Sequence, residues 1–443
     1  MFKKSGKPVL PQAEQDALAL RRRGLTLTLL TVTYFFSYMD RQILSILLEP
    51  IKADLGVSDT QLGLLTGLAF AVFYAVLGIP VARLADRHNR VNIIAISLAL
   101  WSVMTGLCGL AQNFLQLLLA RIGVGVGEAG SSPPSHSMIA DLYPPEKRSG
   151  AMGIYSLGVV FGAGFGTLVG GLLAAAYGWR IAIIAVAIPG VILAVVLKMF
   201  VVEPRRGLSD PVRAAAAGVA QASVAHSTIL DGFKALWANP AARHLVMAVT
   251  VTSLIGYAIT AWSPSFFMRS YGLGLREIAV IIALLATVAG GTSGVVGGRI
   301  ADFVGKRHGV QAQAWLVASL KLAAFPFAIA VYLTNDLAWA LGLYAVAILL
   351  QNSYIGPTFA LIQGQAPLRM RALWAAITLL VINLIGLGAG PTAIGMLSDY
   401  YRPMAGDHSL RYALLTMCAV TPWAIYHYWR AGVHLKRQSS LAT

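Results

Sequence analysis

Five charged residues lie deep inside long apolar stretches of the sequence, where charge is unexpected, and four of them fall in just two stretches. Asp40 and Arg41 fall in the first stretch, and Arg121 and Glu128 fall in the fourth. A charge at the centre of a bilayer costs from about 3 to over 10 kcal/mol, so such residues normally face a cavity and pair with one another. Arg121 and Glu128 are seven positions apart and therefore share one helical face.

These residue types fit two kinds of chemistry. Burial raises and a neighbouring arginine lowers the pKa of a carboxyl, so a buried acid beside arginine can exchange protons near the working pH. We therefore predict that Asp40 and Glu128 couple protons, releasing one when substrate binds and taking one up when it leaves. Arginine forks match phosphate or carboxylate oxygens, so Arg41 and Arg121 are the predicted anion-binding residues. The alternative is an ion-pair network that only fixes helix packing.

Other polar residues within the apolar stretches are weaker candidates. Tyr354 and Asn352 are predicted to offer neutral hydrogen bonds to a substrate, although ordinary bonds between helices explain them equally well. Lys321 is expected to pack between helices or reach water, with a substrate role as the alternative.

The elements that must position these residues follow from the composition. The chain has 443 residues, of which 57% are hydrophobic and only 12% charged, whereas a soluble domain carries about 25% charged residues. This composition excludes a soluble enzyme, a disordered chain and a free nucleic-acid binder. Apolar runs of twenty or more residues lack the alternation of a β-barrel, so an all-α membrane protein is predicted.

Twelve apolar runs are each long enough to cross a bilayer. They are 25–49, 60–82, 91–111, 114–141, 149–177, 181–201, 244–269, 275–298, 312–333, 337–365, 372–398 and 411–430. The first run is too long for a signal peptide and is read as a retained span. The long connection divides the chain into a tail 1–24, a six-helix bundle 25–201, a linker 202–243 with a possible interfacial helix, a second bundle 244–430 and a tail 431–443.

The basic residues indicate the orientation of these spans. Of the 34 Lys and Arg residues, 25 fall on the side of the two tails, 6 fall on the other side and 3 lie within spans. Positive residues concentrate on the cytoplasmic side, so both termini are predicted to be cytoplasmic. The net charge of +16 is therefore a topology signal, and no nucleic-acid partner is expected.

A short motif occurs once in each half of the chain. Residues 82–90 read ARLADRHNR between the second and third spans, and residues 298–306 read GRIADFVGK between the eighth and ninth, 216 positions later. Each carries a small residue, an acid four positions on and a base at the end. These loops are predicted to gate the conformational change, and the residues assigned to this role are Asp86, Arg87, Arg90, Asp302 and Lys306.

The repeated loop resembles the signature of the major facilitator superfamily, although Ala82 and Asn89 stand where that family usually has Gly. The resemblance covers the whole chain and implies two pseudo-symmetric six-helix bundles that rock about a site at the bilayer midplane. Glycines recur every four residues through 158–170 and resemble the fifth-helix motif of family antiporters, without its Pro. As a stripe of small residues they predict a close-packed helix seam.

Three further segments are similar to the Spinster branch of that superfamily: 36–41 (FSYMDR), 127–129 (GEA) and 132–137 (SPPSHS). This branch implies proton-driven export of sphingolipids or lysophospholipids, and its polar core matches Asp40, Arg41, Arg121 and Glu128. The second half contains no deep acid, so we expect a phosphate head on the arginines and an apolar tail against the second half. The two prolines at 133–134 predict local unwinding just after Glu128.

We therefore predict a monomeric, proton-coupled secondary transporter of an anionic amphiphile, residing in a bacterial inner membrane and needing no cofactor. The sequence contains no Walker loop for ATP, and no HExxH or GxSxG motif, so it is not expected to be an enzyme. The two cysteines form no metal-binding spacing. The alternatives are an exporter of drugs or small organic anions, a membrane enzyme acting on lipids, and a channel.

Overall fold

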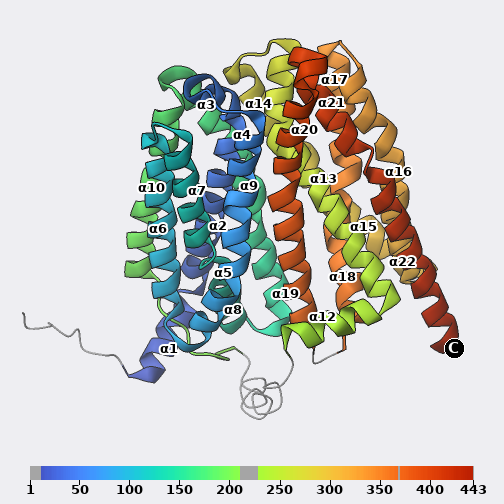
Figure 1. Ribbon diagram of the computed structural model, residues 1–443. Helices are drawn as coiled ribbons and strands as arrows, with labels where there is room; N and C mark the ends of the chain where they lie inside the picture. The colour runs from blue at the N-terminus through green and yellow to red at the C-terminus, as the bar shows by residue number, and fades with distance from the viewer. Residues whose placement is uncertain (1–10, 210–227, 368–369, 443) are drawn as a thin grey trace, which may run out of the picture.

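The computed structural model describes residues 11–209, 228–367 and 370–442, and within them the chain is helical with no β-strand. Parts of the predicted tail 1–24, the linker 202–243 and the tail 431–443 lie outside the described residues. The helices form two bundles that stand side by side, the first coloured blue to green and the second yellow to red (Figure 1). This arrangement confirms the predicted all-α, two-bundle membrane architecture.

The first bundle is built from ten helical segments. They are α1 (Gln12–Arg21), α2 (Arg23–Ile46), α3 (Leu48–Leu55), α4 (Asp59–Thr66), α5 (Leu68–Arg87), α6 (Arg90–Leu110), α7 (Phe114–Glu128), α8 (Ser132–Leu142), α9 (Pro145–Tyr177) and α10 (Trp179–Phe200).

The linker helix and the second bundle follow. Their α-helices are α12 (Ile229–Ala238), α13 (Pro240–Tyr271), α14 (Leu275–Leu285), α15 (Gly291–His308), α16 (Gln311–Leu333), α17 (Leu337–Gln351), α18 (Ile355–Gln365), α19 (Arg371–Val381), α20 (Gly390–Ala405), α21 (Ser409–Cys418) and α22 (Thr421–Ala442). Short π-helical and 3-10 turns join several of them: η1 (Ala286–Gly290), η2 (Asn352–Tyr354), η4 (Ile382–Ala389) and η5 (Gly406–His408).

Nine helical stretches among the described residues are long and apolar enough to cross a membrane. The last of them, Leu373–Ser440, contains two of the predicted spans. The two predicted spans outside these stretches, 25–49 and 114–141, are the ones that carry Asp40, Arg41, Arg121 and Glu128. The second of these spans is interrupted, since α7 ends at Glu128 after 15 residues and is by itself too short to cross a bilayer.

The two ends of the bundles differ, and we name them for later use. The terminal side bears α1, the linker helix α12 and the end of α22, and the far side bears α3 and the beginning of α21 (Figure 1). α12 begins with a capping box at Thr228 and exposes Ile229, Phe233 and Trp237. Its Gly232 packs against α19. The linker thus contains a helix, and its position at the membrane surface stays a prediction.

The glycine stripe of α9 lies against α2, as the four-residue spacing predicts. A Cβ added at Gly158 would lie 2.7 Å from the carbonyl oxygen of Thr31, and one added at Gly166 would lie 2.7 Å from that of Met39. Carbonyl oxygens of the helix backbone cannot retreat from such a contact. The stripe therefore fixes the distance between α9 and the helix that carries Asp40 and Arg41.

We expect Gly166→Ala to lower the midpoint of thermal unfolding of the purified protein by several degrees. The added methyl group overpacks the seam, and overpacking of this kind costs about 1–3 kcal/mol. Gly153→Ala is the matched control, because a Cβ at Gly153 on the same helix meets nothing within 4 Å. This control is expected to keep or raise the midpoint, since alanine is the better helix former. Equal midpoints for the two variants would contradict close packing of α9 against α2 at Gly166.

Candidate functional site

The charged residues of α2 and α7 meet inside the first bundle. Nε of Arg41 donates a hydrogen bond of 2.8 Å to Oε2 of Glu128, and a second guanidinium nitrogen lies 2.7 Å from the same oxygen. Oγ of Ser37 also donates to Oε2, at 2.7 Å. The Glu128 side chain is 0% exposed, whereas that of Arg41 is 12% exposed. Arg41 is therefore the more accessible member of a buried ion pair.

The other carboxylate oxygen of Glu128 is not engaged by the ion pair. Oε1 of Glu128 is buried and has no hydrogen-bond partner among the described residues. A buried acceptor without a partner is costly, and such groups often mark a functional role. Oε1 is thus an available place for a proton or for a donor supplied by a ligand.

The local backbone explains why Glu128 stands at this point. α7 ends at Glu128 and α8 begins at Ser132, with a turn between them in which the amide of Ser131 donates to the Glu128 carbonyl at 3.2 Å. Pro133 and Pro134 follow in the first turn of α8, where a missing amide donor is tolerated. This confirms the predicted unwinding after Glu128.

Aromatic rings surround the guanidinium of Arg41. Its Cζ lies 4.6 Å from the ring centroid of Tyr74, 4.7 Å from that of Phe70 and 5.0 Å from that of Tyr38. An arginine cation over a ring face gains about 0.5–2 kcal/mol, more where water is excluded. The rings hold Arg41 in place without supplying a negative charge, so the cation keeps its affinity for an anion.

Asp40 and Arg121 are buried nearby but are not joined to that ion pair. Oδ2 of Asp40 accepts a hydrogen bond of 3.0 Å from Thr105 of α6. Nε of Arg121 donates to the carbonyl of Leu65 at 3.4 Å, and its Cζ lies 5.3 Å from the centroid of Phe70. Among the described residues no ion pair links Asp40 to either arginine. The expected cluster is thus one ion pair with a flanking acid and a flanking arginine.

The candidates of the second bundle lie apart from this ion pair. The hydroxyl of Tyr354 lies 3.3 Å from that of Ser253, and Nζ of Lys321 lies 4.6 Å from the Tyr354 ring centroid. Lys321 is 4% exposed and lines a small cavity with Thr252, Gln351 and Thr421. Asn352 is exposed and makes no side-chain hydrogen bond among the described residues. Tyr354 also lies close enough to Tyr38, one of the rings around Arg41, for the two phenol groups to interact electrostatically.

The repeated loops differ more in structure than in sequence. Arg90 is fully buried and pairs with Asp141 and with Oε1 of Glu203 at 2.7 Å. It also donates to Ser137 at 2.8 Å. The other residues assigned to gating are exposed and form no side-chain hydrogen bond or salt bridge within the described part of the chain: Asp86, Arg87, Asp302 and Lys306. Asn89 caps α6, because its side-chain oxygen accepts a hydrogen bond of 2.8 Å from the amide of Asn92.

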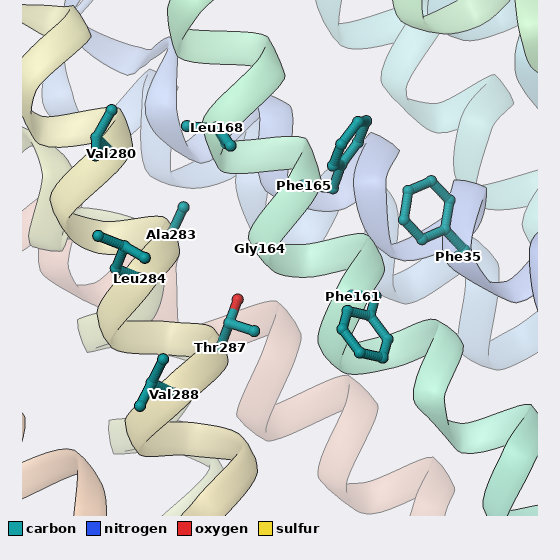
Figure 2. Close-up of a pocket in the computed structure, with 10 residues that line it drawn as sticks. All are labelled: Phe35, Phe161, Gly164, Phe165, Leu168, Val280, Ala283, Leu284, Thr287 and Val288. Carbon is teal, nitrogen blue, oxygen red and sulfur yellow. The ribbon is translucent and has the colours of Figure 1, made fainter.

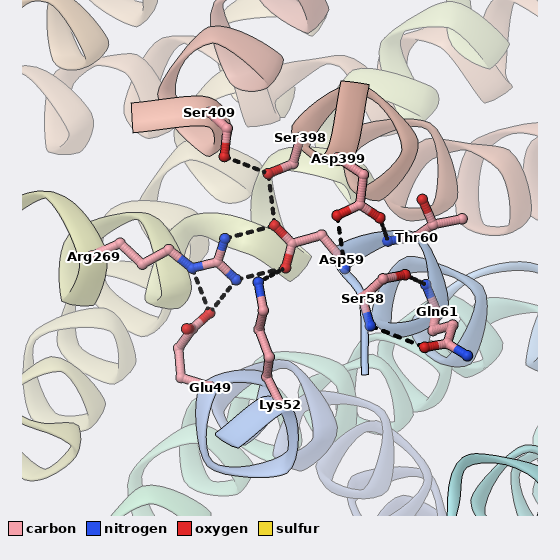
Figure 3. A network of polar contacts seen from close by, with 10 residues as sticks. All are labelled: Glu49, Lys52, Ser58, Asp59, Thr60, Gln61, Arg269, Ser398, Asp399 and Ser409. Carbon is pink, nitrogen blue, oxygen red and sulfur yellow. Dashed lines mark hydrogen bonds and ion pairs between the residues drawn. The ribbon is translucent and has the colours of Figure 1, made fainter. Parts of the chain in front are cut away.

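A second polar network, which the sequence did not reveal, joins the two bundles on the far side (Figure 3). Arg269 of α13 donates to Oε1 of Glu49 at 2.9 Å and to the two oxygens of Asp59 at 2.6 and 2.8 Å. Oγ of Ser398 donates to Asp59 at 2.6 Å. Asp399 accepts from the backbone amides of Asp59 and Thr60 at 3.2 and 2.8 Å. We call this network the far-side lock.

Glycines let the backbones of the two bundles approach each other beneath the far-side lock. A Cβ at Gly63 of α4 would lie 2.6 Å from the carbonyl oxygen of Pro391, and Thr392 donates to the Gly63 carbonyl at 3.1 Å. Nε1 of Trp262 donates to the Pro391 carbonyl at 2.9 Å. The bundles are therefore closed against each other on the far side in this conformation.

We expect Arg269→Gln to open the far side. The substitution leaves Glu49 without its cation and Asp59 with Lys52 as its remaining ion-pair partner. Breaking a buried ion pair costs about 3–5 kcal/mol. Distances between spin labels at Gln112 and Asp407, two exposed far-side positions, should gain a longer component. Arg276→Gln is the control, since Arg276 is exposed on the same side without a salt bridge among the described residues. An unchanged distance distribution in Arg269→Gln would rule out the lock.

An apolar cavity of about 520 Å³ lies at the seam between the bundles (Figure 2). It is open to the surface, because Phe161, Leu284 and Val288 of its lining are more than half exposed. α2 and α9 supply Phe35, Phe161 and Phe165, and the facing wall comes from α14 and η1. The lining residues are Phe35, Phe161, Gly164, Phe165, Leu168, Val280, Ala283, Leu284, Thr287 and Val288. Both bundles therefore contribute apolar surface, whereas the sequence suggested the second bundle alone.

Comparison with known proteins agrees with this architecture. The Major Facilitator Superfamily profile matches residues 30–421. An MFS-type efflux pump of Mycolicibacterium smegmatis is 32% identical over 422 residues, covering 94% of each chain. Protein spinster homolog 1 of Xenopus laevis is 29% identical over 257 residues, which cover 57% of this chain and 47% of that protein.

Solved structures of a bacterial Spinster homolog have the same fold as this chain. A bacterial homolog to the human lysosomal transporter Spinster, in an inward-facing and unoccupied conformation, matches with a TM-score of 0.81 and 29% identity, covering 94% of this chain and 98% of that one. The inward-facing and occupied form matches with a TM-score of 0.79 and 31% identity, covering 92% and 96%. The chain thus belongs to the major facilitator superfamily, a family of multi-pass membrane transporters, and within it is similar to Spinster-type proteins.

Proposed function

We propose that this protein is a proton-coupled secondary transporter that carries an anionic amphiphile of the lysophospholipid or sphingolipid type by alternating access. The observation that carries the proposal is the buried ion pair of Arg41 and Glu128, in which Oε1 of Glu128 has no partner among the described residues. In this proposal the protein works as a monomer in a bacterial inner membrane, with the terminal side cytoplasmic.

The ion pair suggests how protons and substrate are linked. The guanidinium group of Arg41 can neutralise either the Glu128 carboxylate or the phosphate of a substrate. The two anions therefore compete for the same guanidinium group. When a phosphate takes Arg41, Glu128 loses its cation in a buried place and takes up a proton instead. This order, in which proton and anion arrive together, is the reverse of the one expected from the sequence.

The apolar cavity at the seam supports an amphiphilic substrate. It lies beside α2, the helix of Arg41, and is lined by Phe35, Phe161 and Phe165 on one wall and by aliphatic side chains on the other. Its volume of about 520 Å³ is in the range of ligand-sized pockets. An acyl chain can pack against these side chains.

The closed far side supports alternating access. The far-side lock and the glycine contacts of α4 hold the bundles together at one end. The Spinster homolog structures that match most of this chain are described as inward-facing. We therefore infer that the present conformation opens toward the terminal side, where Asp302 and Lys306 are exposed.

Export of drugs or small organic anions is the second candidate, favoured by the efflux pump that is 32% identical along nearly the whole chain. A panel of substrates tested on the purified protein in liposomes separates the two. A lysophospholipid, a sphingoid phosphate, a neutral single-chain lipid, a cationic dye and a small organic anion are each offered with and without a pH gradient. Uptake of the phosphate-bearing lipids driven by the gradient supports the proposal, and gradient-driven movement of the dye alone overturns it.

Proton exchange on binding tests the order of events. In weakly buffered detergent solution with a pH indicator, addition of a phosphate-bearing substrate should remove protons from the medium. Release of protons would contradict competition for Arg41. Glu128→Gln should abolish the signal, whereas Glu146→Gln, at an exposed carboxylate near the start of α9, should leave it unchanged.

A further inference from the structure

Basic side chains gather on the second bundle toward its terminal side. Nδ1 of His244, in the first turns of α13, lies 2.7 Å from Nδ1 of His427 on α22, so the two imidazoles share one hydrogen bond. The ring of His434, two turns further along α22, stacks on His244 with centroids 5.4 Å apart. Arginines of both helices surround these rings. The members of this basic cluster are Arg243, His244, His427, Arg430, His434 and Arg437.

The basic cluster has no internal counter-charge. Arg243 and Arg430 are close enough for their charges to act on both His244 and His434. Within the described residues, none of the cluster's side chains forms a salt bridge with a carboxylate. Nε of Arg430 is buried and has no hydrogen-bond partner in that same part of the chain. Like charges held together in this way favour an anion that neutralises them.

Aromatic residues mark the level of the basic cluster in the membrane. Trp423 and Trp429 of α22 are 51% and 52% exposed, and Trp237 of α12 is 42% exposed. The guanidinium of Arg243 lies 5.9 Å from the Trp237 ring centroid. Trp and Tyr are enriched where a membrane protein meets the headgroups. α12 lies at the end of the second bundle, on the side where α22 ends (Figure 1).

We propose that the basic cluster binds the phosphate headgroup of an anionic phospholipid in the leaflet at the terminal side. Guanidinium forks and imidazole N–H groups suit phosphate oxygens, and the exposed Trp423 and Trp429 suit the adjoining glycerol and upper acyl chain. Basic pockets between membrane helices are known to hold such headgroups. This lipid is a bound ligand of the second bundle. It is distinct from the transported substrate, because Arg41 and Glu128 lie in the first bundle.

The test compares binding of phosphatidylglycerol and phosphatidylcholine of equal chain length to the purified protein by native mass spectrometry. The parent should bind phosphatidylglycerol about tenfold more tightly or better. Arg243→Gln with Arg430→Gln should lose this preference. Arg299→Gln with Arg307→Gln, which removes the same charge from exposed residues of α15, should retain it. A parent without preference, or equal preference in both double variants, overturns the proposal.

Two further measurements test whether the ligand is a lipid or a free phosphate, and whether the glutamine variant fails only because it misfolds. Inorganic phosphate at millimolar concentration should leave phosphatidylglycerol bound, and its displacement would mean that a free anion is the ligand. Arg243→Lys with Arg430→Lys keeps the charge and should keep most of the preference, so a fold defect in the glutamine variant does not decide the outcome. Glu128→Gln should bind phosphatidylglycerol as the parent does, which separates this site from the proposed transport mechanism.

Discussion

Replacing Glu128 by Gln should abolish substrate movement driven by a pH gradient while substrate binding survives. Gln keeps the shape and can still accept from Ser37, but it exchanges no proton and carries no charge for Arg41 to neutralise. Without competition for Arg41, a phosphate-bearing lipid should bind as tightly as in the parent or more tightly. We expect at least about a tenfold loss of gradient-driven uptake in liposomes, with downhill exchange of substrate retained.

Two other variants are compared with Glu128→Gln: Asp40→Asn tests a second carboxyl, and Glu146→Gln is the control. Asp40 is 3% exposed and faces Thr105, and its replacement is also expected to lose coupling if this carboxyl shares the proton. Glu146 lies at the exposed start of α9, so its replacement should change nothing. Gradient-driven uptake at the parental rate in both Glu128→Gln and Asp40→Asn would remove proton coupling from these residues. A conductance of many ions per second that ignores Glu128→Gln would indicate a channel.

Replacing Arg41 by Gln should weaken binding of phosphate-bearing lipids by about tenfold or more, and that of neutral single-chain lipids much less. The fork is lost while the three surrounding rings remain to contact an apolar chain. The single variant leaves Glu128 buried without its cation, which costs about 3–5 kcal/mol of stability. The double variant Arg41→Gln with Glu128→Gln removes both charges and is the better test of binding.

Binding to the double variant can be measured by the change in thermal midpoint on adding a phosphate-bearing lipid or its neutral counterpart. The expected outcome is a shift for the parent and for Arg276→Gln, and none with the phosphate lipid for the double variant. Equal loss of both lipids would show that Arg41 supports the shape of the site and does not recognise the charge.

Much of the architecture is readable from the sequence because it rests on local patterns. Apolar runs gave the spans, the glycine spacing gave the α2–α9 seam, and Pro133 and Pro134 gave the break after Glu128. Each of these depends on residues within a turn or two of one another. The pairing of Arg41 with Glu128 was also foreseeable, since two isolated charges in lipid must find partners.

The remaining contacts depend on residues far apart in the chain. Arg269 meets Asp59 across 210 positions, and Arg90 meets Glu203 across 113. Nothing in the local sequence marks these as partners, because charged residues near span ends are usually only solvated. Thr105 was overlooked as the partner of Asp40 because a threonine within a span normally bonds to its own helix.

The contact of Asp399 with α4 has a consequence for the transport cycle. The first amide groups of a helix have no acceptor within it, and here two of them, at Asp59 and Thr60, are capped by a carboxylate from the opposite bundle. When the bundles separate on this side, the Asp399 carboxylate moves away, and the two amides can hydrogen-bond only to water. α4 should then fray at its start whenever the far side opens, so that amide hydrogen exchange at Asp59 and Thr60 reports how often the bundles separate there.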